Sequence, residues 1–221
     1  RNRQEVDAII NCELCPRRCG VDRSLHRGFC QASSTVKLAL VSLHQWEEPC
    51  LVGERGAGTV FFSYCNLRCV YCQNHEISHG GKGVEVSTER LAEIFLEQQA
   101  RGAATLDLVT PTHYVPQIIA ALDMAKGQGF GLPVVYNSSG YETVETVEAL
   151  RGYVDIFLPD LKYMEPYSAG KYSSAMARNI DNVSGKVISS SPRLLIKSSS
   201  NEELPESRNN LVSVQFPAVL S

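Results

Sequence analysis

The sequence lacks the features that mark membrane, secreted and nucleic-acid-binding proteins. No apolar run approaches the roughly 20 residues that a membrane-spanning helix needs, and residues 1–10 are polar and mixed in charge rather than signal-like. The net charge is −3 and no basic stripe stands out, so the sequence gives no reason to expect a nucleic-acid or membrane partner. With 43% apolar and 20% charged residues among 221, we expect a soluble, cytoplasmic protein with one sizeable core and a small appendage.

Cysteine, by contrast, is abundant, since the chain has 8 cysteines. Without a secretory signal, this number argues for a reducing compartment and for metal binding over disulfides. The clustering of the cysteines supports this interpretation. Four lie between residues 12 and 30, one is Cys50, and three lie between residues 65 and 72.

The three central cysteines carry the strongest signal. Cys65, Cys69 and Cys72 are spaced C-x3-C-x2-C and follow the β-like run 59–62. A [4Fe–4S] cluster normally takes four thiolates, so three leave one iron free to bind a small molecule, whereas structural zinc has four protein ligands. The spacing therefore indicates an open cluster that does chemistry. The alternative is three structural or disulfide-bonded cysteines, which a reducing compartment disfavours.

A second group consists of Cys12, Cys15, Cys19 and Cys30, spaced C-x2-C-x3-C-x10-C in a segment poor in apolar residues. Four thiolates in so short a segment could fold around a metal that supplies most of the stability. A structural zinc and an auxiliary iron–sulfur cluster fit the spacing about equally well. Four free thiols are the simpler alternative, because cysteine is often only a small buried hydrophobe.

Between the two groups we expect a strand at 36–41, followed by His44, Glu47 and Cys50. Their side chains can bind metals, but their spacing matches no known metal-binding motif. We therefore interpret the stretch as a polar loop at a domain junction. The predicted organisation is a Cys-rich metal-binding segment (1–52), a barrel-like segment (53–178) and a divergent, poorly ordered tail (179–221).

From residue 59 onward, short apolar strands alternate with amphipathic helices. We expect strands at 59–63, 106–109, 133–136 and 154–158, and helices at 87–101, 115–126 and 144–150. Ser87 caps the first of these helices, and apolar spacing sets the type of each segment. Repeated βα units predict a parallel α/β architecture, in which chemistry takes place at the carboxyl ends of the strands.

Polar or Gly/Pro-bearing residues follow each predicted strand and should face one end of the barrel. They lie at 65–72, 110–114, 137–141 and 159–162. Each is weak evidence alone, because loop ends also serve structural roles. Asp160 and Lys162 could be a plain surface pair, and His113 could cap the following helix.

The trio of cysteines, with Tyr71 directly before the last, resembles the signature of the radical S-adenosylmethionine (SAM) enzymes. Further matching stretches are CELCPRRCGV, HQWEEPC, GTVFFSYCNLRCVYCQN, LVTPTHYVPQI, VVYNSSGYE and VDIFLPDLKY. Through them residues 12–176 resemble an uncharacterised group related to pyruvate formate-lyase activating enzyme. The resemblance implies a partial (βα)6 barrel and a [4Fe–4S] cluster on Cys65, Cys69 and Cys72. The cluster would bind SAM and, when reduced, cleave it to methionine and a 5′-deoxyadenosyl radical.

The resemblance also implies contacts to the cofactor. Tyr71 would lie beside the adenine, residues 160–162 are similar to a strand-end Asp-x-Lys of glycyl-radical activating enzymes, and residues 137–140 resemble their Asn/Gly loop. The Gly-Gly-Glu stretch that binds the SAM amino group in many members is replaced here by 110–112. We therefore expect no catalytic residue beyond the cluster ligands, and as cofactor-binding residues Tyr71, Asn74, Thr110, Thr112, Asn137, Asp160 and Lys162.

The resemblance fades near residue 177, where members of the group continue with further βα units. The tail has turn- or disorder-like stretches, and only 193–197 and 211–216 could be short strands. Four strands of a six-unit barrel are thus accounted for. This predicts a barrel that is incomplete at its C-terminus and has an exposed sheet edge.

Together these observations predict a radical SAM enzyme that abstracts hydrogen from an unknown substrate. The resemblance implies a glycyl-radical enzyme as one candidate partner and an electron donor such as flavodoxin or ferredoxin. One alternative is a metal-binding adaptor, with zinc at residues 12–30 and an inert barrel. Another is an electron-transfer iron–sulfur protein that does not respond to SAM.

Overall fold

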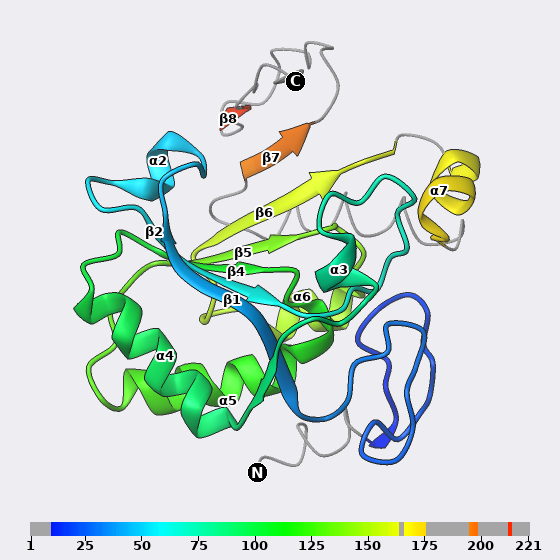
Figure 1. Cartoon of the computed structure of the whole chain (residues 1–221), viewed down its shortest axis with the longest axis horizontal. Coiled ribbons are helices and arrows are strands. Elements are labelled where there is room, and N and C mark those ends of the chain that lie inside the picture. The colour runs from blue at the N-terminus through cyan, green and yellow to red at the C-terminus, as the bar shows by residue number, and fades with distance from the viewer. Residues whose placement is uncertain (1–9, 164–165, 176–194, 199–211, 214–221) are drawn as a thin grey trace.

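The computed structural model describes residues 10–163, 166–175, 195–198 and 212–213. A curved sheet forms its centre, helices cover one face, and a loop-rich N-terminal segment lies beside one end of the strands (Figure 1). The strand order is β3-β1-β2-β4-β5-β6-β7-β8. In chain order the strands are β1 (Val36–His44), β2 (Ala57–Phe62), β3 (Val84–Val86), β4 (Leu106–Val109), β5 (Val134–Ser138), β6 (Ile156–Leu161), β7 (Leu195–Ser198) and β8 (Val212–Ser213).

The larger part of the sheet is parallel, running from β2 through β4, β5, β6 and β7 to β8. Strand β1 joins this part antiparallel to β2, and β3 pairs antiparallel with β1. Parallel neighbours need crossover connections. These contain α4 (Thr88–Ala100), α5 (Val115–Lys126) and α6 (Val144–Ala149). This is the partial α/β barrel that the sequence predicts.

The helices begin where their capping residues predict. The Ser87 hydroxyl oxygen accepts a hydrogen bond from the Arg90 N–H at 3.1 Å and so caps α4. Helix α5 has a proline in its first turn, where the missing N–H costs nothing. The Thr143 hydroxyl accepts from the Thr146 N–H and caps α6.

The main core lies between the sheet and helices α4 and α5. Alternate strand residues point toward the helices, while the residues between them face the inside of the curved sheet. A smaller apolar cluster of Leu51, Val135 and Leu158 lies apart from this core, and Leu51 comes from α2 (Pro49–Val52). The main cluster includes Val60, Phe62, Leu91, Phe95, Leu106, Leu108, Ile118, Leu122 and Val134.

Strand β2 and helix α4 approach closely at Gly58. A Cβ atom there would stand 2.8 Å from the Gln98 Cβ and 3.0 Å from the Ala103 Cβ. The glycine thus lets α4 lie directly on the strand that leads into the cysteine trio.

Some elements differ from the sequence-based expectation. Strand β1 runs on to His44 because it pairs with β2 as far as Ala57. Strand β6 begins two residues later than predicted, because the N–H groups of Tyr153 and Val154 bond back to the Leu150 carbonyl in a turn. The sequence did not predict α2, α3 (His75–Ser78), β3, the 3₁₀ turn η1 (Thr112–Tyr114) or α7 (Pro166–Ser173).

The C-terminal part of the sheet corrects one expectation. The predicted short strands at 193–197 and 211–216 correspond to β7 and β8, and β7 pairs in parallel with β6. We had expected the fourth parallel strand, β6, to be the exposed edge of the sheet. This expectation is wrong, because β7 pairs with β6. The rest of the tail from 179 to 221, with its predicted poor order, lies outside the described residues.

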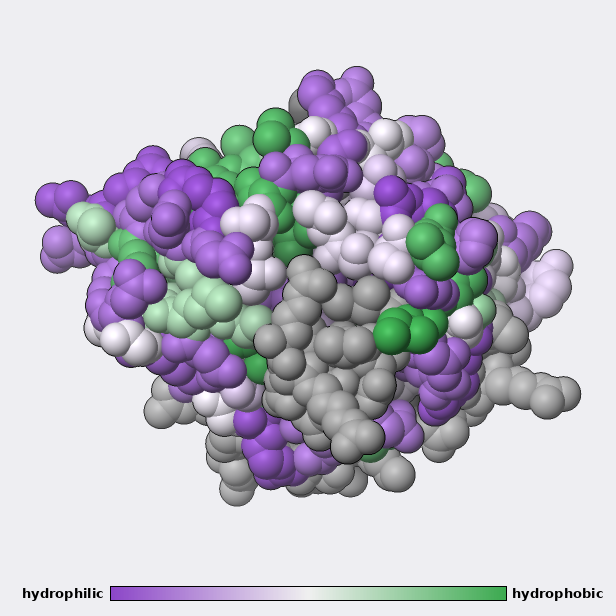
Figure 2. All heavy atoms as spheres, turned by 90° about the horizontal axis from the view of Figure 1, so that it is seen from below, coloured by the Kyte–Doolittle hydropathy of each residue, from purple (hydrophilic) through white to green (hydrophobic). Residues whose placement is uncertain are grey.

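The outer surface on the α4 and α5 side is mostly hydrophilic, with smaller hydrophobic areas between the polar residues (Figure 2). Exposed charges on α4 form ion pairs at helical spacing, from Arg90 to Glu93 and Glu97. Among the described residues, no helix is long and apolar enough to cross a membrane.

Candidate cluster and cofactor site

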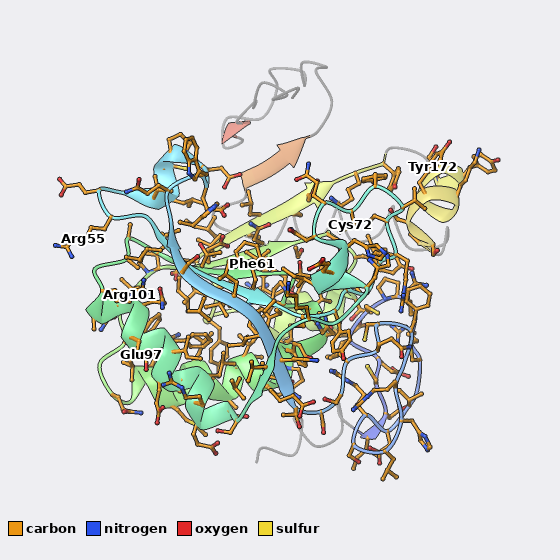
Figure 3. The ribbon with its side chains drawn as sticks, viewed as in Figure 1. Arg55, Phe61, Cys72, Glu97, Arg101 and Tyr172 are labelled. Atoms are coloured by element: carbon orange, nitrogen blue, oxygen red, sulfur yellow. The ribbon has the colours of Figure 1, made fainter. Side chains whose placement is uncertain are left out.

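The three central cysteines lie in a loop that leaves β2 at its carboxyl end. Tyr64 turns the chain with a φ of 74°, and its N–H donates to the Ile77 carbonyl of α3 at 3.0 Å. On the other side, the N–H groups of Arg68 and Val70 donate to the Ser173 and Tyr172 carbonyls of α7. Figure 3 shows Cys72 beside α3 and Tyr172 on α7. The loop is thus fixed through its main chain from both sides.

Each thiol of the trio has a polar neighbour. The Cys65 sulfur accepts from the Leu67 N–H at 3.4 Å, and the Cys69 sulfur accepts from the Ser173 hydroxyl at 2.8 Å. The Cys72 sulfur lies 3.2 Å from the Ser78 hydroxyl oxygen. None of the three is in a disulfide. Iron–sulfur clusters receive hydrogen bonds of this kind at their sulfur ligands.

The thiols also lie within electrostatic range of one another. Burial raises the pKa of Cys65 to about 12, the Leu67 N–H lowers it, Cys69 and Cys72 raise it further, and Lys162 lowers it. A thiol with so high a pKa is protonated near neutral pH, so a metal that binds there must displace the proton.

The donor set fits an iron–sulfur cluster. Three soft thiolates on one loop are the ligands that such clusters use. In the part of the chain that the structure describes, no three His, Cys, Asp or Glu side chains form a group close enough to hold a single metal ion. A cube takes each thiolate at a different iron atom, so its ligands need not converge on one point.

Residues at the ends of β5 and β6 lie near the trio. Asn137, Leu158 and Asp160 share one face of the sheet by strand alternation, and Asn137 pairs in register with Leu158. Asp160 accepts a hydrogen bond from Lys162 and forms an ion pair with it. Burial lowers the pKa of Lys162, but Asp160, with smaller effects from Cys69 and Cys65, leaves the pKa raised. A paired lysine thus lies beside the thiols.

Three other predicted cofactor-binding residues, Thr110, Tyr71 and Asn74, lie on the loop of the trio or directly after β4. Thr110 has a φ of 58° and its N–H donates to the Asn137 carbonyl at 2.8 Å. Tyr71 is 51% exposed, and Asn74 is exposed at the start of α3. Both lie within two residues of Cys72 in the sequence.

Thr112 is not brought to this group. It is buried, and its hydroxyl donates to the Glu142 carboxylate at 2.6 Å. Burial raises the pKa of Glu142, while hydrogen bonds from Thr112 and Ser138 oppose the rise. Thr112 also lines a cavity with the N-terminal cysteines. His113 does not simply cap a helix, because its Nε2 lies 2.8 Å from the Ser63 carbonyl and ties η1 to the end of β2.

A chain of hydroxyl groups connects the exposed tyrosine to the trio. The Tyr71 hydroxyl donates to the Tyr163 hydroxyl at 2.5 Å, which lies 2.6 Å from the Ser173 hydroxyl. Because Ser173 gives its only proton to the Cys69 sulfur, Tyr163 must donate to Ser173. All donors in the chain therefore point toward the sulfur.

Asn66, which the sequence analysis did not single out, joins the loop to the end of β5. Its Nδ2 donates to the Tyr141 carbonyl at 2.6 Å, and its Oδ1 accepts from the Ser139 hydroxyl at 3.3 Å. Its position between Cys65 and Cys69 was the only available signal, since its partners lie more than 70 residues away in the sequence.

Comparison with known proteins agrees with this geometry. The family model of the radical SAM superfamily matches residues 59–185, which is more than half of the chain, and the chain therefore belongs to that family. Membership implies a [4Fe–4S] cluster and SAM as cofactors.

The chain is also 32% identical over 162 residues to an uncharacterized protein of Methanocaldococcus jannaschii. The match covers 69% of this chain and 46% of that protein, so the chain spans less than half the length of this relative.

Replacing Asn66 tests how firmly the loop is tied to β5. Asn66→Ala removes the hydrogen bonds of the buried Asn66 side chain to the Tyr141 carbonyl and the Ser139 hydroxyl, and we expect a loss of about 1–3 kcal/mol in the free energy of unfolding. Gln73→Ala, an exposed position on the same loop, should cost about 0.5 kcal/mol or less. Anaerobic urea unfolding measures both. Equal losses in the two variants would contradict the role given to Asn66.

Proposed function

We propose that Cys65, Cys69 and Cys72 hold the [4Fe–4S] cluster and that the protein uses it to abstract hydrogen from a substrate. The observation that carries the proposal is the placement of three free thiols at the carboxyl end of β2, with Asp160 and Lys162 beside them. In parallel barrels the chemistry takes place at this end. When bound, the cluster supplies an electron that cleaves SAM to methionine and a 5′-deoxyadenosyl radical.

The chain's own residues bind and orient SAM. Tyr71 offers an exposed ring next to Cys72 for the adenine. Asn74 lies exposed at the start of α3, and Thr110 directly follows β4. Asn137 and the Asp160–Lys162 pair supply an amide and opposite charges on the inner face of β5 and β6. Thr112 has its hydroxyl committed to Glu142, so Thr110 is the better candidate within 110–112 for the SAM amino group.

The activating type of radical SAM enzyme is our proposal for the reaction class. The resemblance of residues 160–162 to the Asp-x-Lys of glycyl-radical activating enzymes supports it. A glycyl-radical enzyme would then be the partner, and flavodoxin or ferredoxin the electron donor. Eight cysteines, none of which forms a disulfide, support a reducing compartment such as the cytoplasm.

Reductive cleavage of SAM tests the proposal. Anaerobically reconstituted protein, reduced in the presence of SAM, should yield 5′-deoxyadenosine and methionine, measured by chromatography and mass spectrometry. Cys65→Ala, Cys69→Ala and Cys72→Ala should each reduce the yield to background, because each removes one cluster ligand. Cys50→Ala is the matched control, since Cys50 is exposed in α2 at the opposite end of β2.

Two results would contradict the proposal: wild-type yield from the trio variants, or a reducible cluster whose spectrum ignores SAM. The latter would favour the electron-transfer protein. Zinc without any iron uptake would favour the adaptor.

Ser173→Ala tests the hydroxyl chain. Removing the hydrogen bond to the Cys69 sulfur should lower the reduction potential of the cluster, on the order of tens of millivolts, because such bonds stabilise the reduced form. Ser174→Ala is the control, because Ser174 is exposed and adjacent. A redox titration followed by electron paramagnetic resonance gives both potentials. Identical potentials would show that the hydroxyl chain does not tune the cluster.

A further inference from the structure

The N-terminal knuckle, defined as residues 12–30, folds without a regular helix or strand. The Cys12 N–H donates to the Val21 carbonyl, the Gly20 N–H donates back to the Cys12 carbonyl, and the Arg18 N–H donates to the Cys15 carbonyl. These turns fold the segment back on itself beside α6, at the end of the sheet (Figure 1). Without the regular hydrogen bonds of a helix or sheet, the knuckle has little to stabilise it, and a bound metal could supply much of its stability.

All four cysteines of the knuckle line one small cavity, with a volume of about 20 Å³. This is enough for a particle the size of a water molecule. A Cβ atom at Gly28, also in the lining, would stand 3.1 Å from the Cys19 sulfur. Because Gly28 has no side chain, the Cys19 sulfur can lie at the cavity without a steric clash.

A buried guanidinium at the same cavity points to an anionic occupant. Arg23 is 1% exposed, its Nη1 and Nη2 donate to the His113 and Ser33 carbonyls, and its Nε has no partner among the described residues. Within those residues no carboxylate forms an ion pair with Arg23. A buried guanidinium without an anion is costly.

We propose that Cys12, Cys15, Cys19 and Cys30 bind a second metal centre through four thiolates, either a zinc ion or an iron–sulfur cluster. Four thiolates with a doubly charged ion or cluster carry a net charge of about −2, which supplies the anion that Arg23 lacks. Among the described residues the thiols do not form a close group. A zinc ion would draw them inward, whereas the larger cube takes each thiolate at a different iron atom and needs the cavity to widen. Either centre releases the thiol protons. This proposal does not rest on the proposed function.

The second centre would also support the loop of the first. Arg17 lies between Cys15 and Cys19, its Nε donates to the Asn66 carbonyl at 2.8 Å, and its Nη2 donates to the Ser174 carbonyl at 2.6 Å. Its guanidinium carbon lies 3.3 Å from the centre of the Phe29 ring. A metal that orders the knuckle therefore orders Arg17, which positions the main chain between Cys65 and Cys69.

Metal analysis of two full-length variants tests the proposal. In the first, Cys65→Ala, Cys69→Ala and Cys72→Ala are combined, and in the second Cys12→Ala, Cys15→Ala, Cys19→Ala and Cys30→Ala. Each is analysed for iron and zinc as purified and after anaerobic reconstitution with iron and sulfide. We expect the first variant to retain about one zinc or about four irons per chain, and the second to lose that amount. Cys50→Ala should match the wild type.

Both metals support the proposal, and the visible absorption of an iron–sulfur cluster distinguishes it from colourless zinc. If the first variant binds neither metal, the second centre does not exist. This result decides the question even if the second variant fails to fold. The two proposals can fail separately. If the wild-type chain forms no 5′-deoxyadenosine but the first variant keeps its metal, the proposed function is wrong and the second centre is supported.

Discussion

The main-chain hydrogen bonds that hold the loop of Cys65, Cys69 and Cys72 are the constraint on which the rest of the structure depends. The loop leaves β2, is held by α3 at Tyr64 and by the end of α7 at Arg68 and Val70, and so keeps three thiols at the carboxyl end of the parallel strands. Three protein sulfurs, rather than four, are what allow a cluster to bind a small molecule. The parallel sheet then brings Asn137, Asp160 and Lys162 to the same end.

Side chains around the loop determine the electrostatic environment of its three thiols. The Asp160–Lys162 pair places a compensated lysine beside the thiols, and the hydroxyl chain from Tyr71 ends on the Cys69 sulfur. Under the proposed function Tyr71 would also meet the adenine, so that cofactor binding and the electronic environment of the cluster would involve the same side chain. On the opposite side, Arg17 of the knuckle donates a hydrogen bond to the main chain of the loop at Asn66.

Local pattern was sufficient to predict the longer elements. Strand β4 at 106–109 and helix α5 at 115–126 have the predicted bounds, because their apolar residues keep a clear period and a proline marks the start of α5. The family and its cofactors followed from the trio and the stretches around it. The four-residue helices α2 and α3 were missed because they are too short to show a period. Asn66 and Ser173 were missed because their partners lie 75 and 104 residues away, and Thr112 bonds to Glu142, on a different loop.

The central claim is that one iron of the cluster lacks a protein ligand and binds SAM directly. Electron–nuclear double resonance on the reduced, reconstituted protein tests it, using SAM labelled with ¹⁵N in the amino group and ¹⁷O in the carboxylate. We predict hyperfine coupling of both labels to the cluster, since both atoms would be ligands of the fourth iron. A spectrum that is unchanged by SAM and shows no coupling to either label would contradict the claim.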